Sequence, residues 1–171
     1  SNMAKRKEQF YVDLAFRSEL HNWRTPDWLF QTLDKFFSFD TDVCANDSNF
    51  LCENYFTAEN SCFDNPWGKM NYMNPPYGRE IGLFCKEALK QWRDHNKMTI
   101  ALLPSRTDTK WFHNFIYGKA HIFFIRGRLR FNDQPNPAPF PSMIVFWGVE
   151  DNRVLNVLFE EVQKGRDEQG K

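Results

Sequence analysis

A run of five residues in the middle of the chain, from Thr99 to Leu103 (TIALL), most tightly constrains the fold. An uninterrupted apolar run of this length is typical of a strand that is covered on both faces, as in a parallel sheet. Apolar residues recur at helical spacing on either side of it, from Ile81 to about His95 and again from Trp111 to Ile116. A buried strand between two amphipathic helices predicts an α/β sheet flanked by helices.

The rest of the chain extends this alternation. Thr25-Pro26 is typical of a helix start, because threonine can cap a helix and proline is tolerated at its first position. We therefore expect a helix from Pro26 to about Phe36. The segment between 46 and 70 lacks a period and is expected to be mainly loop. The remaining expected elements are strands at 39–45, 70–73 and 120–125, an antiparallel pair at 129–131 and 142–147, and a helix at 154–163.

The length of 171 residues and the single alternating pattern predict one domain, from about residue 23 to 165. Ser1-Asn2 before Met3 resembles the remnant of a cleaved tag. We expect residues 3–22 to form a partly ordered N-terminal arm and residues 166–171 a charged, frayed tail.

Composition narrows the class of protein. No apolar run approaches the roughly 20 residues that span a bilayer, and no leader is recognisable, so we expect a soluble, cytoplasmic protein without a membrane partner. The four cysteines lack a CxxC spacing, which favours free thiols over disulfides or a metal site.

The 22 Lys and Arg residues are balanced by 22 Asp and Glu residues, so the net charge of the chain does not favour nucleic acid. Any surface that binds nucleic acid must therefore be a local cluster of basic residues. Arg126, Arg128 and Arg130 form a basic cluster. If they lie on a strand, their side chains share one face and suit a row of phosphates. The alternative is a solvated edge strand that is charged against aggregation.

The segment Asn74-Pro75-Pro76-Tyr77 directly follows the strand predicted at 70–73. Two prolines cannot continue a ladder, so the chain must leave the sheet here. The amide oxygen of Asn74 and the rigidly held carbonyl of Pro75 could accept the hydrogens of an aromatic amine. Tyr77 offers a flat face on which a flipped-out base could stack. The alternative is a strand-ending turn without chemistry.

Five sequence blocks occur in order over most of the chain: Trp23-Arg-Thr25-Pro26, Phe39-Asp-Thr-Asp42-Val-Cys-Ala45, Asn74-Pro-Pro-Tyr77-Gly78, Leu103-Pro104-Ser-Arg106-Thr-Asp108-Thr-Lys110-Trp-Phe112 and Phe140-Pro-Ser-Met143. Together they resemble the phage-type DNA N-6-adenine methyltransferase family, which is Dam-like. The resemblance implies a compact Rossmann-like class I methyltransferase sheet with an antiparallel C-terminal hairpin. It also implies methyl transfer from S-adenosylmethionine to N6 of an adenine flipped out of duplex DNA, in the host cytoplasm if the protein is phage-encoded. The catalytic residues would be Asn74, Pro75, Pro76 and Tyr77.

The resemblance further implies where the cofactor binds. In amino-methyltransferases the first strand ends in a glycine-rich turn around the methionine part of the cofactor, and here Asp42 to Ala45 occupies that place without the glycines. Asp42 could instead cap the turn after its strand, and Thr25 could simply cap its helix. The expected cofactor-binding residues are Trp23, Thr25, Pro26, Asp42, Cys44, Ala45, Asp47 and Asn74, with Asp64 a weaker candidate.

Arg106, Asp108 and Lys110 follow the 99–103 strand and should share a rim with the catalytic loop, where they could position DNA, although Asp108 could merely cap its helix. The proline-rich stretch 132–141 is the best candidate for a lid or sequence reader. Alternative functions are an amino-methyltransferase acting on RNA, cytosine or protein glutamine, and a noncatalytic DNA-binding remnant that the missing glycines keep open.

Overall fold

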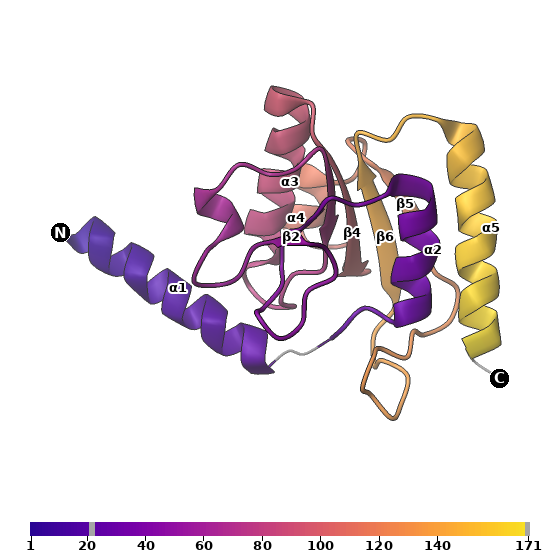
Figure 1. Ribbon diagram of the computed structural model, residues 1–171, viewed down its shortest axis with the longest axis horizontal. Helices are drawn as coiled ribbons and strands as arrows, with labels where there is room; N and C mark the ends of the chain where they lie inside the picture. Colours follow the sequence, from indigo (N-terminus) through magenta and orange to yellow (C-terminus); the bar gives the residue numbers. More distant parts are fainter. Residues whose placement is uncertain (21–22, 170–171) are drawn as a thin grey trace.

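A computed structural model describes residues 1–20 and 23–169 and contains a six-stranded sheet with helices on both faces (Figure 1). The strand order is β2-β1-β3-β4-β6-β5, in which the first four strands are parallel and β6 is antiparallel to both of its neighbours. The predicted α/β, Rossmann-like sheet with an antiparallel C-terminal part is confirmed. The strands are β1 (Thr41–Asp42), β2 (Asn54–Tyr55), β3 (Met70–Met73), β4 (Met98–Pro104), β5 (His121–Phe124) and β6 (Ser142–Trp147).

Helices cover both faces of the sheet, α2 (Asp27–Phe37) beside α5 (Asn152–Gln169) on one and α3 (Ile81–His95) beside α4 (Lys110–Phe115) on the other (Figure 1). On the first face, both Phe37 and Phe159 pack on Phe146 of β6, with ring centroids 6.0 Å and 5.6 Å away. On the second face, the Trp147 indole donates to the Phe115 carbonyl over 2.8 Å. Neighbouring residues of β6 thus point to opposite layers, as strand geometry requires.

The core is centred on β4 and β6, which pair from Thr99 with Trp147 to Pro104 with Ser142. Residues 100–103 and 143–147 have no exposed surface. The apolar run at 99–103 is therefore a strand buried on both faces, as predicted.

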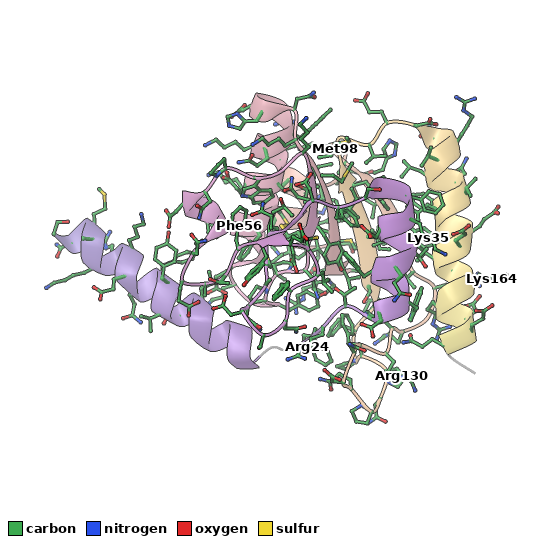
Figure 2. The ribbon with its side chains drawn as sticks, in the orientation of Figure 1. Arg24, Lys35, Phe56, Met98, Arg130 and Lys164 are labelled. Atoms are coloured by element: carbon green, nitrogen blue, oxygen red, sulfur yellow. The ribbon has the colours of Figure 1, made fainter. Side chains whose placement is uncertain are left out.

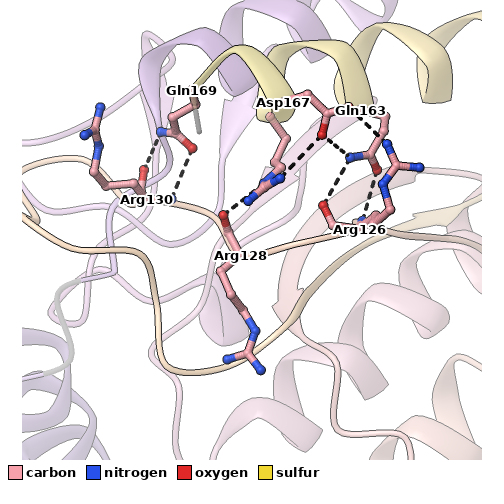
Figure 3. Close-up of polar contacts among 7 residues, drawn as sticks. Arg126, Arg128, Arg130, Gln163, Asp167 and Gln169 are labelled. Carbon is pink, nitrogen blue, oxygen red and sulfur yellow. Dashed lines mark hydrogen bonds and ion pairs between the residues drawn. The ribbon is translucent and has the colours of Figure 1, made fainter. Parts of the chain in front are cut away.

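The segment 126–130 and strand β5 correct two other predictions. Residues 129–131 form no strand, and the antiparallel partners of β6 are β4 and β5. Segment 126–130 instead runs along α5, whose glutamine side chains bond its backbone (Figure 3). Strand β5 lies at the sheet edge and is only half-buried, since a strand with one neighbour leaves part of its surface to solvent.

Both ends of the chain are more ordered than expected. Residues 2–20, expected as a partly ordered arm, form helix α1 (Asn2–Leu20), which contacts the short 3-10 helix η1 (Cys62–Asp64) through Phe10 and Phe63 and buries Leu14. At the other end, α5 continues to Gln169 instead of fraying at 166. Residues 21–22 of the expected arm and 170–171 of the expected tail lie outside the described residues. No helix within 1–20 or 23–169 is long and apolar enough to cross a membrane.

Candidate active site

A cavity opens at the carboxyl ends of β1 and β3. From this pair the chain connects outward in opposite directions, from β1 to β2 and from β3 to β4. Such a reversal of strand order is where open α/β sheets bind their ligands. The cavity is lined by Leu14, Trp23, Arg24, Thr25, Asp27, Asp42, Val43, Cys44, Ala45, Asn46, Asn49, Leu51, Thr57, Ala58, Ser61, Cys62, Tyr72, Asn74, Pro75, Pro76, Phe84 and Asn132.

Asn74 stands in the cavity wall immediately after β3. Its Nδ2 donates to the Trp23 carbonyl over 2.6 Å and to Thr25 Oγ1 over 3.2 Å. Its Oδ1 is buried and has no hydrogen-bond partner among the described residues. A buried amide oxygen without a partner is costly, so an acceptor in this state is suited to a donor that arrives with a ligand.

The Thr25 hydroxyl bonds residues in the cavity wall and does not cap helix α2. The N-cap of α2 is Pro26, with no side-chain cap bond from the described residues. The Thr25 hydroxyl lies 2.5 Å from the Tyr72 hydroxyl and accepts from Asn74. The helix-cap alternative for Thr25 is therefore wrong, because its hydroxyl is engaged by two residues from β3 and the loop after it.

Asp42 ends β1 at the floor of the cavity and is 3% exposed. Its Oδ1 accepts from the Cys44 amide over 3.3 Å, and its Oδ2 accepts from the Leu51 amide over 3.1 Å. Burial raises the pKa of Asp42 to about 6, although these two backbone donors work in the opposite direction. Asp42 thus holds the turn after its strand, as the alternative reading required, and also faces the cavity.

The turn after β1 is built without the usual glycines. The Ala45 amide donates to the Phe56 carbonyl over 2.9 Å, and Asn46 and Asn49 close a tight turn through their backbones. Burial raises the pKa of the Cys44 thiol well above its ordinary value, which keeps this side chain neutral. Cys44 and Ala45 both line the cavity, and their small side chains leave it open at this turn.

Several lining residues were not anticipated from the sequence. Asn46, Asn49, Thr57 and Ser61 come from the segment between β1 and β3, which has no helical or strand period. Their signal was the high Asn and Ser content of that segment, which we had interpreted only as loop.

Three residues expected at the cofactor lie outside the cavity lining. Pro26 is buried at the start of α2. Asp47 is exposed and accepts from the Tyr55 hydroxyl over 3.0 Å. Asp64 accepts from the Tyr11 hydroxyl of α1 and pairs with Lys7 over 3.4 Å.

Tyr77, the last residue of the Asn74-Pro75-Pro76-Tyr77 segment, is buried, with 4% of its surface exposed. Its hydroxyl donates to the Leu102 carbonyl over 3.2 Å. Phe131 and Phe140 pack against it in edge-to-face geometry, with centroids 6.2 Å and 5.6 Å away. In this arrangement the ring is held between β4 and the proline-rich loop, and a base reaches its face only if that loop moves.

The proline-rich loop 132–141 is docked on the segment that precedes α2. Asn132 donates its backbone amide to the Arg24 carbonyl over 2.9 Å and its side-chain amide to Asp27 over 3.2 Å. Arg24 pairs with Asp133 over 3.0 Å, and Phe140 packs on Trp23 at 5.1 Å. The loop therefore forms one rim of the cavity.

The residues expected to position DNA beside the catalytic loop are exposed. Arg106, Asp108 and Lys110 follow β4, which lies next to β3 in the sheet. Thr109 caps α4 by accepting from the Phe112 amide over 3.3 Å, so the cap alternative for Asp108 is wrong. Arg106 and Lys110 thus form no ion pair within residues 1–20 and 23–169.

The basic cluster does not present a single row of guanidinium groups. Arg126, Arg128 and Arg130 are exposed, but they lie outside the sheet and their side chains point in different directions (Figure 3). Arg126 pairs with Asp167 over 3.0 Å. The strand geometry that we predicted for this cluster is wrong, because side chains of α5 replace a neighbouring strand. Arg130 lies at the same edge of the molecule as Arg24, opposite Met98 at the amino end of β4 (Figure 2).

The described residues contain no group of three or more His, Cys, Asp or Glu side chains that could hold a metal ion. Cys44, Cys52, Cys62 and Cys85 are free thiols.

Comparison with known proteins agrees with this geometry. A sequence model of the family described as DNA N-6-adenine-methyltransferase (Dam) matches residues 15–162. The chain belongs to this family. Among relatives of the Dam family, the chain is 33% identical over 112 residues to a DNA N-6-adenine-methyltransferase of Haemophilus phage HP1 (strain HP1c1), an alignment that covers 64% of each chain. It is 33% identical over 110 residues to a DNA N-6-adenine-methyltransferase of Escherichia phage T1, covering 63% of this chain and 45% of the relative. The alignments thus span less than two thirds of the curated Dam relatives.

Proposed function

We propose that this chain transfers a methyl group from S-adenosylmethionine to N6 of adenine in DNA. The names of the two phage relatives support the reaction and the acceptor. Because those relatives come from phages, we place the reaction in the cytoplasm of an infected host cell. The observation that carries the proposal is the buried Oδ1 of Asn74 at the cavity wall, which has no hydrogen-bond partner within residues 1–20 and 23–169.

Asn74 and Pro75 supply the acceptors that the reaction needs. The N6 lone pair of adenine is delocalised into the ring, so the amine gains nucleophilicity when its hydrogens are held by acceptors out of the plane. Asn74 Oδ1 and the Pro75 carbonyl are two such acceptors on one rigid loop. A sulfonium-bound methyl group is already activated, so no strong general base is required from the protein.

The side chains that line the cavity are chemically suited to the proposed cofactor. Asp42 offers a carboxylate to a ligand that carries an ammonium and a sulfonium group, and a positive charge nearby would favour the ionised form of this buried acid. Cys44 and Ala45 keep the turn after β1 small, and Trp23 adds an aromatic wall. We propose Trp23, Asp42, Cys44, Ala45 and Asn74 as the residues around the cofactor, whereas Thr25, which was also expected there, lines the same cavity with its hydroxyl engaged by Tyr72 and Asn74.

DNA would approach the rim that carries Arg106 and Lys110, with Arg128 and Arg130 contacting phosphates further along the same edge. The adenine would leave the duplex and enter beside Asn74. Tyr77 can stack on it only after the proline-rich loop, with Phe140, has moved away. This loop is thus proposed as a lid that opens for the base.

The test is transfer of labelled methyl groups from S-adenosylmethionine to mixed-sequence duplex DNA, followed by digestion and identification of the labelled nucleoside. Label in N6-methyladenine supports the proposal. Label in another nucleoside, or in RNA or protein offered in parallel, overturns the acceptor and keeps the enzyme class.

A noncatalytic DNA-binding remnant is a second candidate, favoured by the turn without glycines at the cofactor site and by the covered Tyr77. Thermal unfolding with and without S-adenosylhomocysteine separates the two, because a ligand that binds only the folded state raises the midpoint. A rise supports the enzyme. No shift at saturating ligand, together with DNA binding, supports the remnant.

A further inference from the structure

A polar chain in the wall of the cavity joins three segments: Thr25 before α2, Tyr72 in β3 and Asn74 after β3. Thr25 is 6% exposed and Tyr72 is fully buried. We propose that Thr25 and Tyr72 are positioning residues that fix the side-chain amide of Asn74 with its oxygen toward the cavity. This inference rests on the proposed methyl transfer and assigns to Thr25 a task other than cofactor contact.

The hydrogen bonds allow only one orientation of the amide. The Trp23 carbonyl can only accept, so the Asn74 atom 2.6 Å away must be the nitrogen. The second hydrogen of that nitrogen then points to Thr25 Oγ1 at 3.2 Å. Rotating the amide by half a turn would bring two oxygens together at Trp23. The oxygen is therefore the atom left for a ligand, in agreement with its missing partner among the described residues.

Thr25 can accept from Asn74 only while its own position is fixed, and Tyr72 fixes it. The two hydroxyl oxygens lie 2.5 Å apart, and the Thr25 oxygen has lone pairs to accept from Asn74 whichever hydroxyl donates. Tyr72 is held in turn by Phe30 and Phe39, whose rings pack edge-to-face on it at 5.3 Å and 5.4 Å. Burial raises the pKa of Tyr72 well above its ordinary value, so this hydroxyl stays protonated at neutral pH.

The Thr25 hydroxyl is the partner of two polar groups, the Tyr72 hydroxyl and the Asn74 amide nitrogen. The hydroxyl does not cap α2. Because Thr25 is buried, its hydroxyl needs hydrogen-bond partners to offset the loss of contact with water. Its contacts lead to Asn74, whose buried amide oxygen in the cavity wall lacks a partner among the described residues. If the bond to Thr25 is lost, the amide keeps only the Trp23 contact and rotates more freely.

The experiment compares Thr25→Val, which keeps the shape of the side chain, with Thr25→Ser, which restores the hydroxyl. One net hydrogen bond corresponds to a fall in kcat of up to about tenfold for Thr25→Val, with the dissociation constant of S-adenosylhomocysteine unchanged. Thr25→Ser should recover most of kcat, and Tyr72→Phe should lower it in the same direction. A raised KM for S-adenosylmethionine at unchanged kcat would overturn the proposal in favour of a cofactor contact.

A second readout needs neither cofactor nor activity. In ¹H–¹⁵N spectra of the free protein, the side-chain amide of Asn74, assigned by its loss in Asn74→Ala, should exchange slowly with solvent. Exchange should be faster in Thr25→Val and Tyr72→Phe than in Thr25→Ser. Rapid exchange already in the unmodified protein would contradict the proposal. If the unmodified protein methylates nothing, the proposed function fails, while these spectra still decide whether Thr25 and Tyr72 hold the amide.

Discussion

At the scale of single residues, the site depends on how Asn74 and Asp42 are held. The amide of Asn74 donates twice to fixed acceptors, so its oxygen is directed by the fold before any ligand arrives. Asp42 is a buried carboxylate at the cavity, and each of its oxygens accepts one backbone amide. The Asn74 oxygen has no partner among the described residues, which is expected of a group whose partner is on a ligand.

Replacing Asn74 by aspartate tests the donor role of its nitrogen. A carboxylate would place an oxygen at the position of Nδ2, which now donates to the Trp23 carbonyl. Two acceptor oxygens would then face each other. We expect Asn74→Asp to lower the free energy of unfolding at neutral pH by about 1–3 kcal/mol. The exposed Asn156→Asp on α5 is the matched control and should change little. Equal urea midpoints for the two variants would argue against the donor role.

Asp42 should make stability depend on pH. Its pKa in the folded protein, about 6, lies above its ordinary value of 3.8, so folding favours the protonated form. Its contribution is therefore fully present below about pH 4 and is lost as the pH rises through 6, by an amount on the order of 3 kcal/mol. In urea unfolding at several pH values, Asp42→Asn should lose this dependence between pH 4 and 6. The exposed Asp94→Asn should keep it, and an unchanged profile in Asp42→Asn would refute the assignment.

At the scale of elements, α5 replaces a strand for the segment that follows β5. Gln163 both accepts from the Arg126 amide and donates to the Arg126 carbonyl, over 3.0 Å and 3.1 Å. Gln169 does the same for Arg130, and Arg166 donates to the Arg128 carbonyl over 3.1 Å. Side chains three residues apart on one helix thus satisfy the backbone of an extended segment, which explains why α5 stays helical to Gln169.

Removing one of these glutamines should loosen the segment. We expect Gln163→Ala to lower the free energy of unfolding by on the order of 1–2 kcal/mol, because two backbone groups lose a partner. The exposed Gln31→Ala on α2 should stay within about 0.5 kcal/mol of the unmodified protein. Urea unfolding of the two variants gives the comparison, and indistinguishable values would mean that α5 does not hold the segment.

Elements could be predicted from the sequence where their own residues carry the signal, and could not where their partners lie far away along the chain. Residues 99–103 were predicted as a buried strand because five adjacent apolar side chains carry that information themselves. Leu129 and Phe131 are buried and Arg130 between them is exposed, the same alternation as in a strand, but the backbone of Arg130 bonds the side chain of Gln169, 39 residues away along the chain. No local pattern distinguishes these two cases.

The residues of the candidate site also differ in whether the sequence predicted them. Asn74 and its prolines were found from the sequence because they form a compact motif at the end of a strand. The hydrogen bonds of the Thr25 hydroxyl were not predicted, because its partner Tyr72 lies 47 positions away and the local Thr-Pro pair favours a helix cap. Helix α1 was missed although Phe10 and Leu14 have helical spacing, because its side chains face a 3-10 helix that the sequence did not reveal.

At the scale of the whole molecule, the balanced net charge restricts the proposed DNA binding to one edge. Arg106 and Lys110 follow β4, and Arg128 and Arg130 follow β5, whereas the acidic partner of the cluster, Asp167, engages Arg126. Only some of the arginines counted in the sequence are thus expected to neutralise phosphates.

The salt dependence of DNA binding checks this division. Each phosphate contact contributes a slope of about 0.9 in log affinity against log salt, so Arg128→Gln with Arg130→Gln should reduce the slope by about 1.8. Arg153→Gln, at the other end of α5, should leave it unchanged. Titrations of duplex DNA at several salt concentrations give the slopes. Equal slopes for the double variant and for Arg153→Gln would place the DNA elsewhere.

The measurement that tests the central claim most directly is single-turnover methyl transfer to adenine in duplex DNA by the unmodified protein, by Asn74→Ala and by the exposed control Asn156→Ala. If Asn74 Oδ1 holds the adenine amine, the rate for Asn74→Ala should fall by about 100-fold or more at saturating cofactor, whereas Asn156→Ala should retain the full rate. Methylation of adenine by Asn74→Ala at the rate of the control would contradict the account.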